Sequence, residues 1–257
     1  LRPALSLLPA SGIGALLQNN WLVDNNGGNC AVLGALLEVV GGNLSSDASC
    51  RDFLQGGAGQ IKPLGQYGGP VPTRPPTSGS AAIDRGGCTD ADSSQALGED
   101  ARVVPRPQDG DGVPGALCDA GAAEYTLNQP PGITLPPART ALAATPLPLG
   151  STSGAIHIDD PLEHGLPVSL RLEPDHGTVD MATSGLTCTT GDGVDDLLLV
   201  CRAPLVALNR ALQTLVYTPA AGFIGAEALR VEVDDLGAGG DDNLPRGAVA
   251  DLAITVV

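Results

Sequence analysis

The chain has 257 residues, of which 42 % are hydrophobic, so we expect one or two domains with packed cores and exclude global disorder. Its formal net charge is −16 and Lys62 is the only lysine, which argues against nucleic acid as a partner because an acidic surface repels phosphates. The 35 glycines and 22 prolines favour many short strands joined by turns over long helices.

Residues 3–23 carry no charge, but we do not predict a transmembrane helix there. A span needs about 20 predominantly apolar residues. Proline, glycine and amide residues interrupt this run, at Pro9, Gly12, Gly14, Gln18, Asn19 and Asn20. The sequence shows no secretory leader, so we expect a trimmed mature chain or a piece of a longer one.

The six cysteines fall into three local pairs, each of which brackets one loop or hairpin. The pairs are Cys30/Cys50, Cys88/Cys118 and Cys188/Cys201. None has the C-x-x-C spacing of a zinc site. We therefore predict three structural disulfides formed in an oxidising compartment, with free buried thiols as the alternative.

Short apolar stretches alternate with asparagine and glycine clusters over residues 13–44. The stretches are 13–17, 21–23, 31–33 and 36–40, and the clusters are 18–20, 24–29 and 41–43. This spacing suits the rungs of a parallel β-helix, because asparagine and glycine tolerate the left-handed backbone of sharp corners. Ordinary hairpins would permit the same spacing. Residues 51–124 are dominated by Gly, Pro and Asp, and we expect an irregular cap that covers the last rung.

Six sequence pieces then carry a family resemblance. They are Asn25–Cys30, Gly41–Cys50, Pro63–Thr73, Gly79–Asp84, Val104–Pro107 and Cys118–Glu124. In this order and spacing, residues 13–125 resemble the C-terminal end of the bacterial choice-of-anchor Q β-helix proteins. The resemblance implies the terminal rungs and cap of a right-handed parallel β-helix, in a secreted, surface-sorted protein without established catalysis in this segment. The many upstream rungs expected of such a solenoid are missing from the sequence.

The second half changes to longer, more widely spaced strands. We predict strands at 133–135, 155–158, 168–172, 178–181, 197–201, 214–217, 228–233 and 248–256. This number of short strands in about 125 residues favours a β-sandwich. Leucines at helical spacing over 204–213 predict one short helix that crosses between sheets. The domain boundaries we predict are 1–124 for rungs and cap, 125–132 for a proline-stiffened linker, and 133–257 for the sandwich.

The second half also resembles a family. The matching pieces are Asp175–Thr178, Gly185–Thr187, Gly191–Gly193, Leu208–Leu212, Leu215–Ala220, Gly222–Gly225 and Val231–Gly237. In this order, residues 133–257 resemble the cadherin-like, Ig-like repeats of large bacterial surface proteins and adhesins. The fold class that we expect for the whole chain is therefore all-β, a β-helix end followed by an Ig/cadherin-like β-sandwich.

Catalysis finds little support in the sequence. The three histidines, His157, His164 and His176, each stand alone, and no G-x-S-x-G nucleophile elbow occurs. The glycine-rich segments 12–14 and 56–59 do not open a helix after a strand, as a phosphate-binding loop would. We predict that the chain is not an enzyme.

Acidic pairs at strand ends are the candidate metal ligands. We predict that Asp159, Asp160, Asp234 and Asp235 hold calcium, which takes six to eight oxygen ligands. Glu163 accompanies the first pair and Asp241 and Asp242 accompany the second, so two loops could supply the oxygens jointly. The cadherin-like resemblance favours this metal, although residues 138–144 hold no acid where many relatives carry an acidic pair. Solvated turns are the alternative, because aspartate is common in turns.

A structural or adhesive protein, extracellular or displayed on a bacterial cell surface, is the function that these features favour. The alternative is the C-terminal region of a carbohydrate-active β-helix enzyme with an accessory binding module. The partners we expect are other surface proteins, glycans or further copies of the chain. If the chain is complete, the apolar residues 1–23 predict head-to-tail assembly into filaments.

Overall fold

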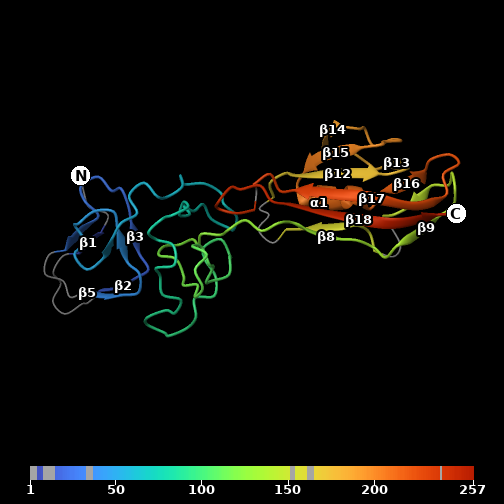
Figure 1. The fold of residues 1–257 in the computed structure, drawn as a ribbon. Coiled ribbons are helices and arrows are strands. Elements are labelled where there is room, and N and C mark those ends of the chain that lie inside the picture. Colours follow the sequence, from blue (N-terminus) through green and yellow to red (C-terminus); the bar gives the residue numbers. More distant parts are fainter. Residues whose placement is uncertain (1–4, 8–14, 33–36, 151–153, 161–164, 238) are drawn as a thin grey trace. The chain divides into compact units, whose positions relative to one another are not determined.

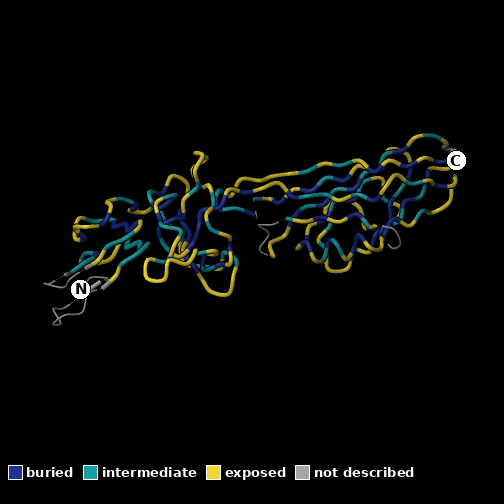
Figure 2. Tube along the Cα trace, turned by 90° about the horizontal axis from the view of Figure 1, so that it is seen from below, coloured by how far each residue is buried: buried dark blue, intermediate teal, exposed yellow. Residues whose placement is uncertain are grey.

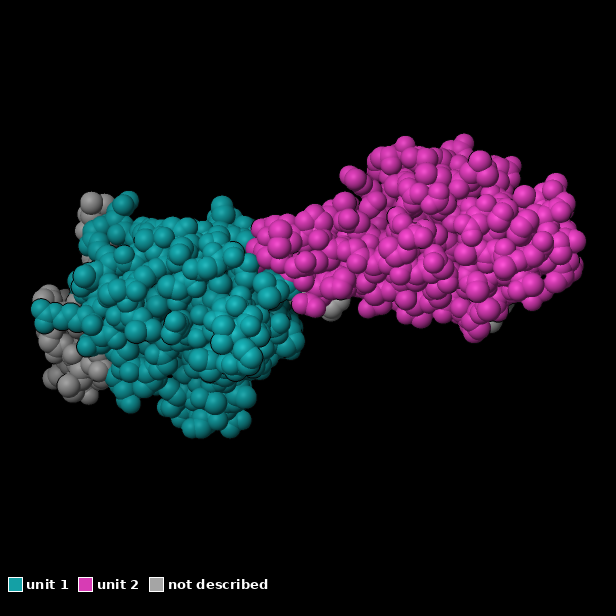
Figure 3. Space-filling model, viewed as in Figure 1, with its two compact units in different colours: residues 1–127 teal, residues 128–257 magenta. Residues whose placement is uncertain are grey.

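The computed structural model describes all residues except 1–4, 8–14, 33–36, 151–153, 161–164 and 238. The chain divides into two compact units, residues 1–127 and 128–257 (Figure 3). Among the described residues all regular elements are strands except one helix, α1 (Leu205–Leu212), so the prediction of a mostly β protein is confirmed. Within the described residues, no helix has the length and apolarity needed to cross a membrane. The segment 1–23, through which assembly was predicted, lies partly outside the described residues, at 1–4 and 8–14.

Seven short strands near the N-terminus pair only in parallel within the described residues. They are β1 (Leu5–Leu7), β2 (Ala15–Gln18), β3 (Trp21–Leu22), β4 (Cys30–Val32), β5 (Leu37–Val40), β6 (Leu44–Ser45) and β7 (Leu54–Gln55). The ladders are β1–β4, β2–β5 and β3–β6–β7. A hairpin joins antiparallel strands, so the alternative of ordinary hairpins is wrong for these strands.

The registers of the first three ladders follow one another along the chain. Leu5 pairs with Cys30, Ala15 with Leu37, and Trp21 with Leu44, so each partner lies 22 to 25 residues further on. Strands β1, β2 and β3 therefore pair, in that order, with β4, β5 and β6. We call strands β1–β3 the first circuit and strands β4–β6 the second, because each strand of the first set pairs in parallel with its counterpart in the second.

A cap without extended strands follows β7. Residues 56–131, which the structure describes throughout, contain isolated bridges but no strand. The cap packs closely on the second circuit of chain, because a Cβ on Gly42 would lie 1.4 Å from the carbonyl oxygen of Arg85. A small core of Leu44, Ala82 and Ala120 lies between the circuits and the cap.

The start of the predicted linker 125–132 is not an exposed connection. Tyr125 and Thr126 are each 2 % exposed, and Asn128 is 3 % exposed. The boundary between the units falls between residues 127 and 128, inside the predicted linker. The pattern Asn-Gln-Pro-Pro-Gly predicted a proline-stiffened linker, but buried hydrogen bonds of Tyr125 and Asn128 fix its beginning.

The second unit contains one six-stranded sheet, with strand order β14-β15-β12-β17-β18-β9 (Figure 1). Its strands are β14 (Thr187–Thr190), β15 (Leu199–Ala203), β12 (Val168–Pro174), β17 (Gly225–Asp234), β18 (Gly247–Val256) and β9 (Arg139–Ala141). Two smaller sheets have the orders β10-β16-β13 and β11-β8. Their strands are β10 (Leu147–Pro148), β16 (Val216–Pro219), β13 (Gly177–Asp180), β11 (His157–Asp159) and β8 (Gly132–Thr134).

Alternation of side chains places one core between these sheets. Every second residue of β12, from Val168 to Pro174, is buried. Buried and more exposed positions alternate along the strands of this unit (Figure 2). Leu170 and Leu172 pack in one cluster with Tyr217 of β16 and Leu208 of α1. The eight strands predicted in this half and the helix at 204–213 each overlap an observed element. The sequence reasoning missed β9, β10 and β14.

Candidate functional site

The four predicted metal ligands lie at strand ends of the second unit but differ in environment. Asp159 ends β11 and Asp234 ends β17, and both are exposed. Asp160 is partly buried, whereas Asp235 is fully buried. The set therefore combines two solvated carboxylates with two that protein groups surround.

Asp235 already has protein donors on both carboxylate oxygens. Its Oδ1 accepts the backbone N–H groups of Gly237 and Arg246, each at 2.8 Å. Its Oδ2 accepts the side-chain amide of Asn128 at 2.5 Å. Asp235 therefore organises the loop after β17 and is poorly suited to be a metal ligand.

Asn128 is the residue that the sequence reasoning missed. Its Nδ2 also donates to the carbonyl of Leu244 at 2.7 Å, but its Oδ1 is buried without a hydrogen-bond partner. A Cβ on Gly239 would lie 2.2 Å from that Oδ1 and 3.4 Å from Oδ1 of Asp160. An amide oxygen without a donor therefore faces the same glycine as a carboxylate, and both are ligand types that calcium prefers.

Two further aspartates and one arginine complete this acidic neighbourhood. Asp241 is 5 % exposed, and Asp242 accepts the backbone N–H of Asn128 at 3.3 Å. Arg246 Nη2 lies 3.5 Å from Oδ2 of Asp242, so it offsets part of the negative charge. Among the described residues, these aspartates do not bring three carboxylates within 4.8 Å of one another.

A different acidic trio does converge, in the cap. Asp84, Asp109 and Asp111 place one carboxylate oxygen each within 4.8 Å of the others. However, Asp84 Oδ2 accepts the N–H groups of Gly110 and Asp111, and its Oδ1 accepts that of Leu117. Since Asp109 and Asp111 are exposed, the trio is explained as a loop held by Asp84.

Buried charges hold the cap together. Asp100 forms an ion pair with Arg102 at 3.0 Å, and Arg106 Nε lies 3.3 Å from Oε1 of Glu124. Asp119 is fully buried and accepts the backbone N–H of Asp84 at 2.7 Å. Burial raises the pKa of Asp119 to about 7, and burial also raises the pKa of Glu124.

The described histidines do not form a catalytic arrangement with a nucleophile. His157 is exposed on β11, and His164 lies outside the described residues. His176 stacks on Phe223 with ring centroids 4.1 Å apart, and its Nδ1 lies 3.3 Å from Oε2 of Glu227. Buried Glu227 also accepts the backbone N–H of His176 at 2.8 Å, so this contact fixes a turn.

All three predicted cysteine pairs are joined as disulfides. Cys30–Cys50 links the start of β4 to the loop after β6, and Cys88–Cys118 closes a loop of the cap. Cys188 and Cys201 are direct cross-strand partners on β14 and β15. Each disulfide therefore lies inside one compact unit.

No protein-family model and no curated protein matches the chain. Two solved structures are similar at a low level. A cohesin module from a Clostridium perfringens family 33 glycoside hydrolase is 7 % identical, with a TM-score of 0.28, and the match covers 51 % of this chain and 100 % of that one. AggA, the major subunit of aggregative adherence fimbriae type I from Escherichia coli, is 14 % identical, with a TM-score of 0.30 and coverage of 52 % and 100 %. At these TM-scores neither similarity carries an argument.

Proposed function

We propose that this chain is a structural or adhesive protein of a bacterial cell surface, in which the closing rungs and cap of a parallel β-helix precede an Ig/cadherin-like sandwich. The observation that carries the proposal is the run of three parallel ladders in matched register, β1–β4, β2–β5 and β3–β6. A chain that repeats its circuit in this way stacks each rung on its neighbour, as solenoids do.

A pair of hydrogen-bonded asparagines supports the same interpretation. Asn43 is 2 % exposed and immediately precedes Leu44. Asn20 immediately precedes Trp21, which is the ladder partner of Leu44. The two asparagines bond each other at 2.9 Å between Nδ2 of Asn20 and Oδ1 of Asn43. Equivalent amides at equivalent corners are what a repeated rung produces.

The location outside the cell rests on the three disulfides and the acidic charge. Structural disulfides persist in oxidising compartments. A net charge of −16 favours solubility of a protein that is exposed to the medium outside the cell. The cap, with its buried ion pairs, would close the end of the solenoid core.

Within the sandwich we propose a calcium ion beside Asn128. The unpartnered Oδ1 of Asn128 and the carboxylate of Asp160 supply the first oxygens, and Asp241 and Asp242 lie on the same loop as Gly239. Calcium in this position would bind the start of the second unit to the loop that follows β17.

Immunogold labelling of intact producing cells tests the surface role. We expect label on the outside of unpermeabilised cells and no release of reducing ends from polyuronate substrates by the purified chain. Label only after permeabilisation would contradict a surface location. Cleavage of an acidic polysaccharide would favour the alternative of a β-helix enzyme.

A further inference from the structure

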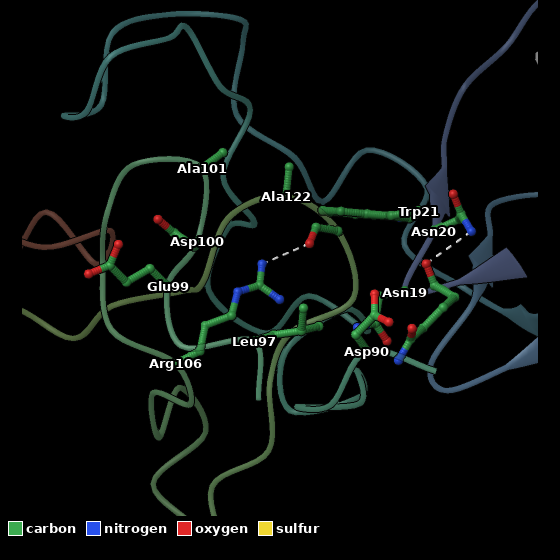
Figure 4. Close-up of a pocket in the computed structure, with 12 residues that line it drawn as sticks. Asn19, Asn20, Trp21, Asp90, Leu97, Glu99, Asp100, Ala101, Arg106 and Ala122 are labelled. Atoms are coloured by element: carbon green, nitrogen blue, oxygen red, sulfur yellow. Dashed lines mark hydrogen bonds between the residues drawn. The ribbon is translucent and has the colours of Figure 1, made fainter. Parts of the chain in front are cut away.

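A concave pocket lies within the first unit, where the corner after β2 meets the loops of the cap (Figure 4). Its volume is about 600 Å³, which falls in the range of small-molecule sites. It is lined by residues 18–21 from the rungs and by eight residues from the cap, which are Asp90, Leu97, Glu99, Asp100, Ala101, Arg106, Gly121 and Ala122.

The walls of the pocket are fixed by hydrogen bonds between rung and cap. The side-chain amide of Asn19 donates to the carbonyl of Gly87 and accepts its N–H, both at 2.7 Å. Gln18 bonds in the same way, donating to the carbonyl of Thr89 and accepting from the N–H of Ala91 at 2.8 Å. The pocket is therefore preformed, which lowers the entropic cost of binding.

An apolar surface and a pinned arginine form one side. Trp21, the only tryptophan of the chain, lies beside Ala122, with Leu97 across the pocket (Figure 4). Arg106 points inward, but its Nη2 donates to the carbonyl of Gly121 at 2.9 Å and its Nε faces Glu124. Because that charge is paired, the arginine does not make the pocket cationic.

The remaining polar groups are mainly acceptors. Glu99 is exposed, and its carboxylate makes no hydrogen bond or ion pair with described residues. Asp90 uses one oxygen, Oδ1, for the N–H and hydroxyl groups of Ser93, which leaves Oδ2 available. Asn20 donates through Nδ2, and its Oδ1 makes no bond to the described part of the chain.

We propose that this pocket binds a short neutral or amino-sugar oligosaccharide. Hydroxyl and ammonium groups would donate to Glu99, Asp90 and Asn20. The apolar face of a sugar ring would contact the parts of Trp21, Leu97 and Ala122 that line the pocket. The two carboxylates disfavour uronic acids, because like charges repel at close range. This binding goes beyond the proposed surface role and does not depend on it.

Fluorescence of Trp21 reports binding directly, since the chain has no other tryptophan. The intact chain would be titrated with neutral glucan and galactan oligomers, chitosan oligomers, oligogalacturonate and trilysine. We expect a saturable change with at least one neutral or amino-sugar series, and none with oligogalacturonate. A saturable response to trilysine or oligogalacturonate alone, or no response to any oligosaccharide at 10 mM (roughly tenfold above a millimolar Kd), would overturn the proposal.

Two variants place the binding in the pocket. Glu99→Gln removes a charge-assisted hydrogen bond and should weaken binding about tenfold without changing the melting temperature. Ala122 is exposed and lines the pocket, so the phenyl ring of Ala122→Phe would occupy part of the pocket and should abolish binding. Glu38→Gln is the matched control, because Glu38 is exposed on β5 outside the pocket. Equal affinity in Glu99→Gln, Ala122→Phe and Glu38→Gln would overturn the proposal.

Discussion

Asn43 bonds both the backbone and the side chain of Asn20, the residue at the equivalent corner one circuit earlier. Its Oδ1 accepts the backbone N–H of Asn20 at 3.0 Å and the side-chain amide at 2.9 Å. Its Nδ2 donates to the carbonyls of Leu17 at 3.0 Å and Val40 at 2.8 Å. One buried amide therefore satisfies backbone groups of two successive circuits.

Replacing Asn43 by alanine should destabilise the first unit by about 3 kcal/mol, because several buried backbone groups would lose their partners. Chemical denaturation followed by circular dichroism measures this loss. Asn25→Ala is the control, since Asn25 is exposed and its side chain bonds only that of Asn29 among described residues. Equal midpoints for the two variants would refute the role given to Asn43.

Each disulfide should stabilise only the unit that contains it. The cysteines are separated by 20 residues in Cys30–Cys50 and by 13 in Cys188–Cys201, and closing such loops contributes about 3 kcal/mol in the chain-entropy model. In calorimetry, the double variant Cys30→Ala, Cys50→Ala should lower the melting temperature of the first unit. The double variant Cys188→Ala, Cys201→Ala should lower that of the second unit. A shift of both transitions by either double variant would show that the units unfold together.

The sequence could predict features that depend on neighbouring residues. Cysteines that bracket a single loop pair locally, and the leucines at 205, 208 and 212 mark one face of α1 without long-range information. The edge strand β14 was missed because three of its four residues are exposed, which leaves no alternating apolar pattern. Strand β9 was missed because it pairs in parallel with β18, more than a hundred residues later.

The sites depended on contacts that no local pattern carries. Asn128 was placed in a linker, and its bonds to Asp235 and Leu244 join residues more than a hundred positions apart. The pocket near Trp21 exists because Asn19 and Gly87, 68 positions apart, meet when the cap packs on the parallel strands before it. Neither juxtaposition follows from composition or spacing.

The first unit should lose stability as the pH rises through 7. Burial raises the pKa of Asp119 from 3.8 to about 7, so the folded chain keeps a proton there that the unfolded chain releases at a much lower pH. The stabilising contribution is therefore complete below pH 3.8 and is lost as the pH rises through about 7. The raised pKa of Glu124 acts in the same direction.

Thermal unfolding between pH 5 and pH 8 measures this dependence, and no histidine lies in the first unit to obscure it. Asp119→Asn should flatten the pH dependence of the melting temperature of the first unit. Asp52→Asn, at an exposed position of the same unit, should leave it as in the unchanged chain. A slope unaffected by Asp119→Asn would show that another group binds the proton.

Calcium should stabilise the second unit through Asn128 and Asp160. The Oδ1 of Asn128 is buried without a hydrogen-bond partner, and a cation held there would supply the missing interaction. At a calcium concentration of about one hundred times the Kd, binding to the folded state adds about 2.7 kcal/mol, so the melting temperature of the second transition should rise.

The neighbouring aspartates provide a matched pair for this test. Asp160→Asn should abolish the calcium-dependent shift, because its carboxylate faces Gly239 together with the Oδ1 of Asn128. Asp159→Asn should leave the shift intact, because Asp159 is exposed at the end of β11. Magnesium should give a smaller shift, since it demands a compact octahedron that this loop of scattered oxygens does not supply. If Asp159→Asn abolished the shift and Asp160→Asn did not, the ion would bind at the exposed strand ends. If millimolar calcium left the melting temperature of the second unit unchanged, the proposal of a calcium site in this unit would be wrong.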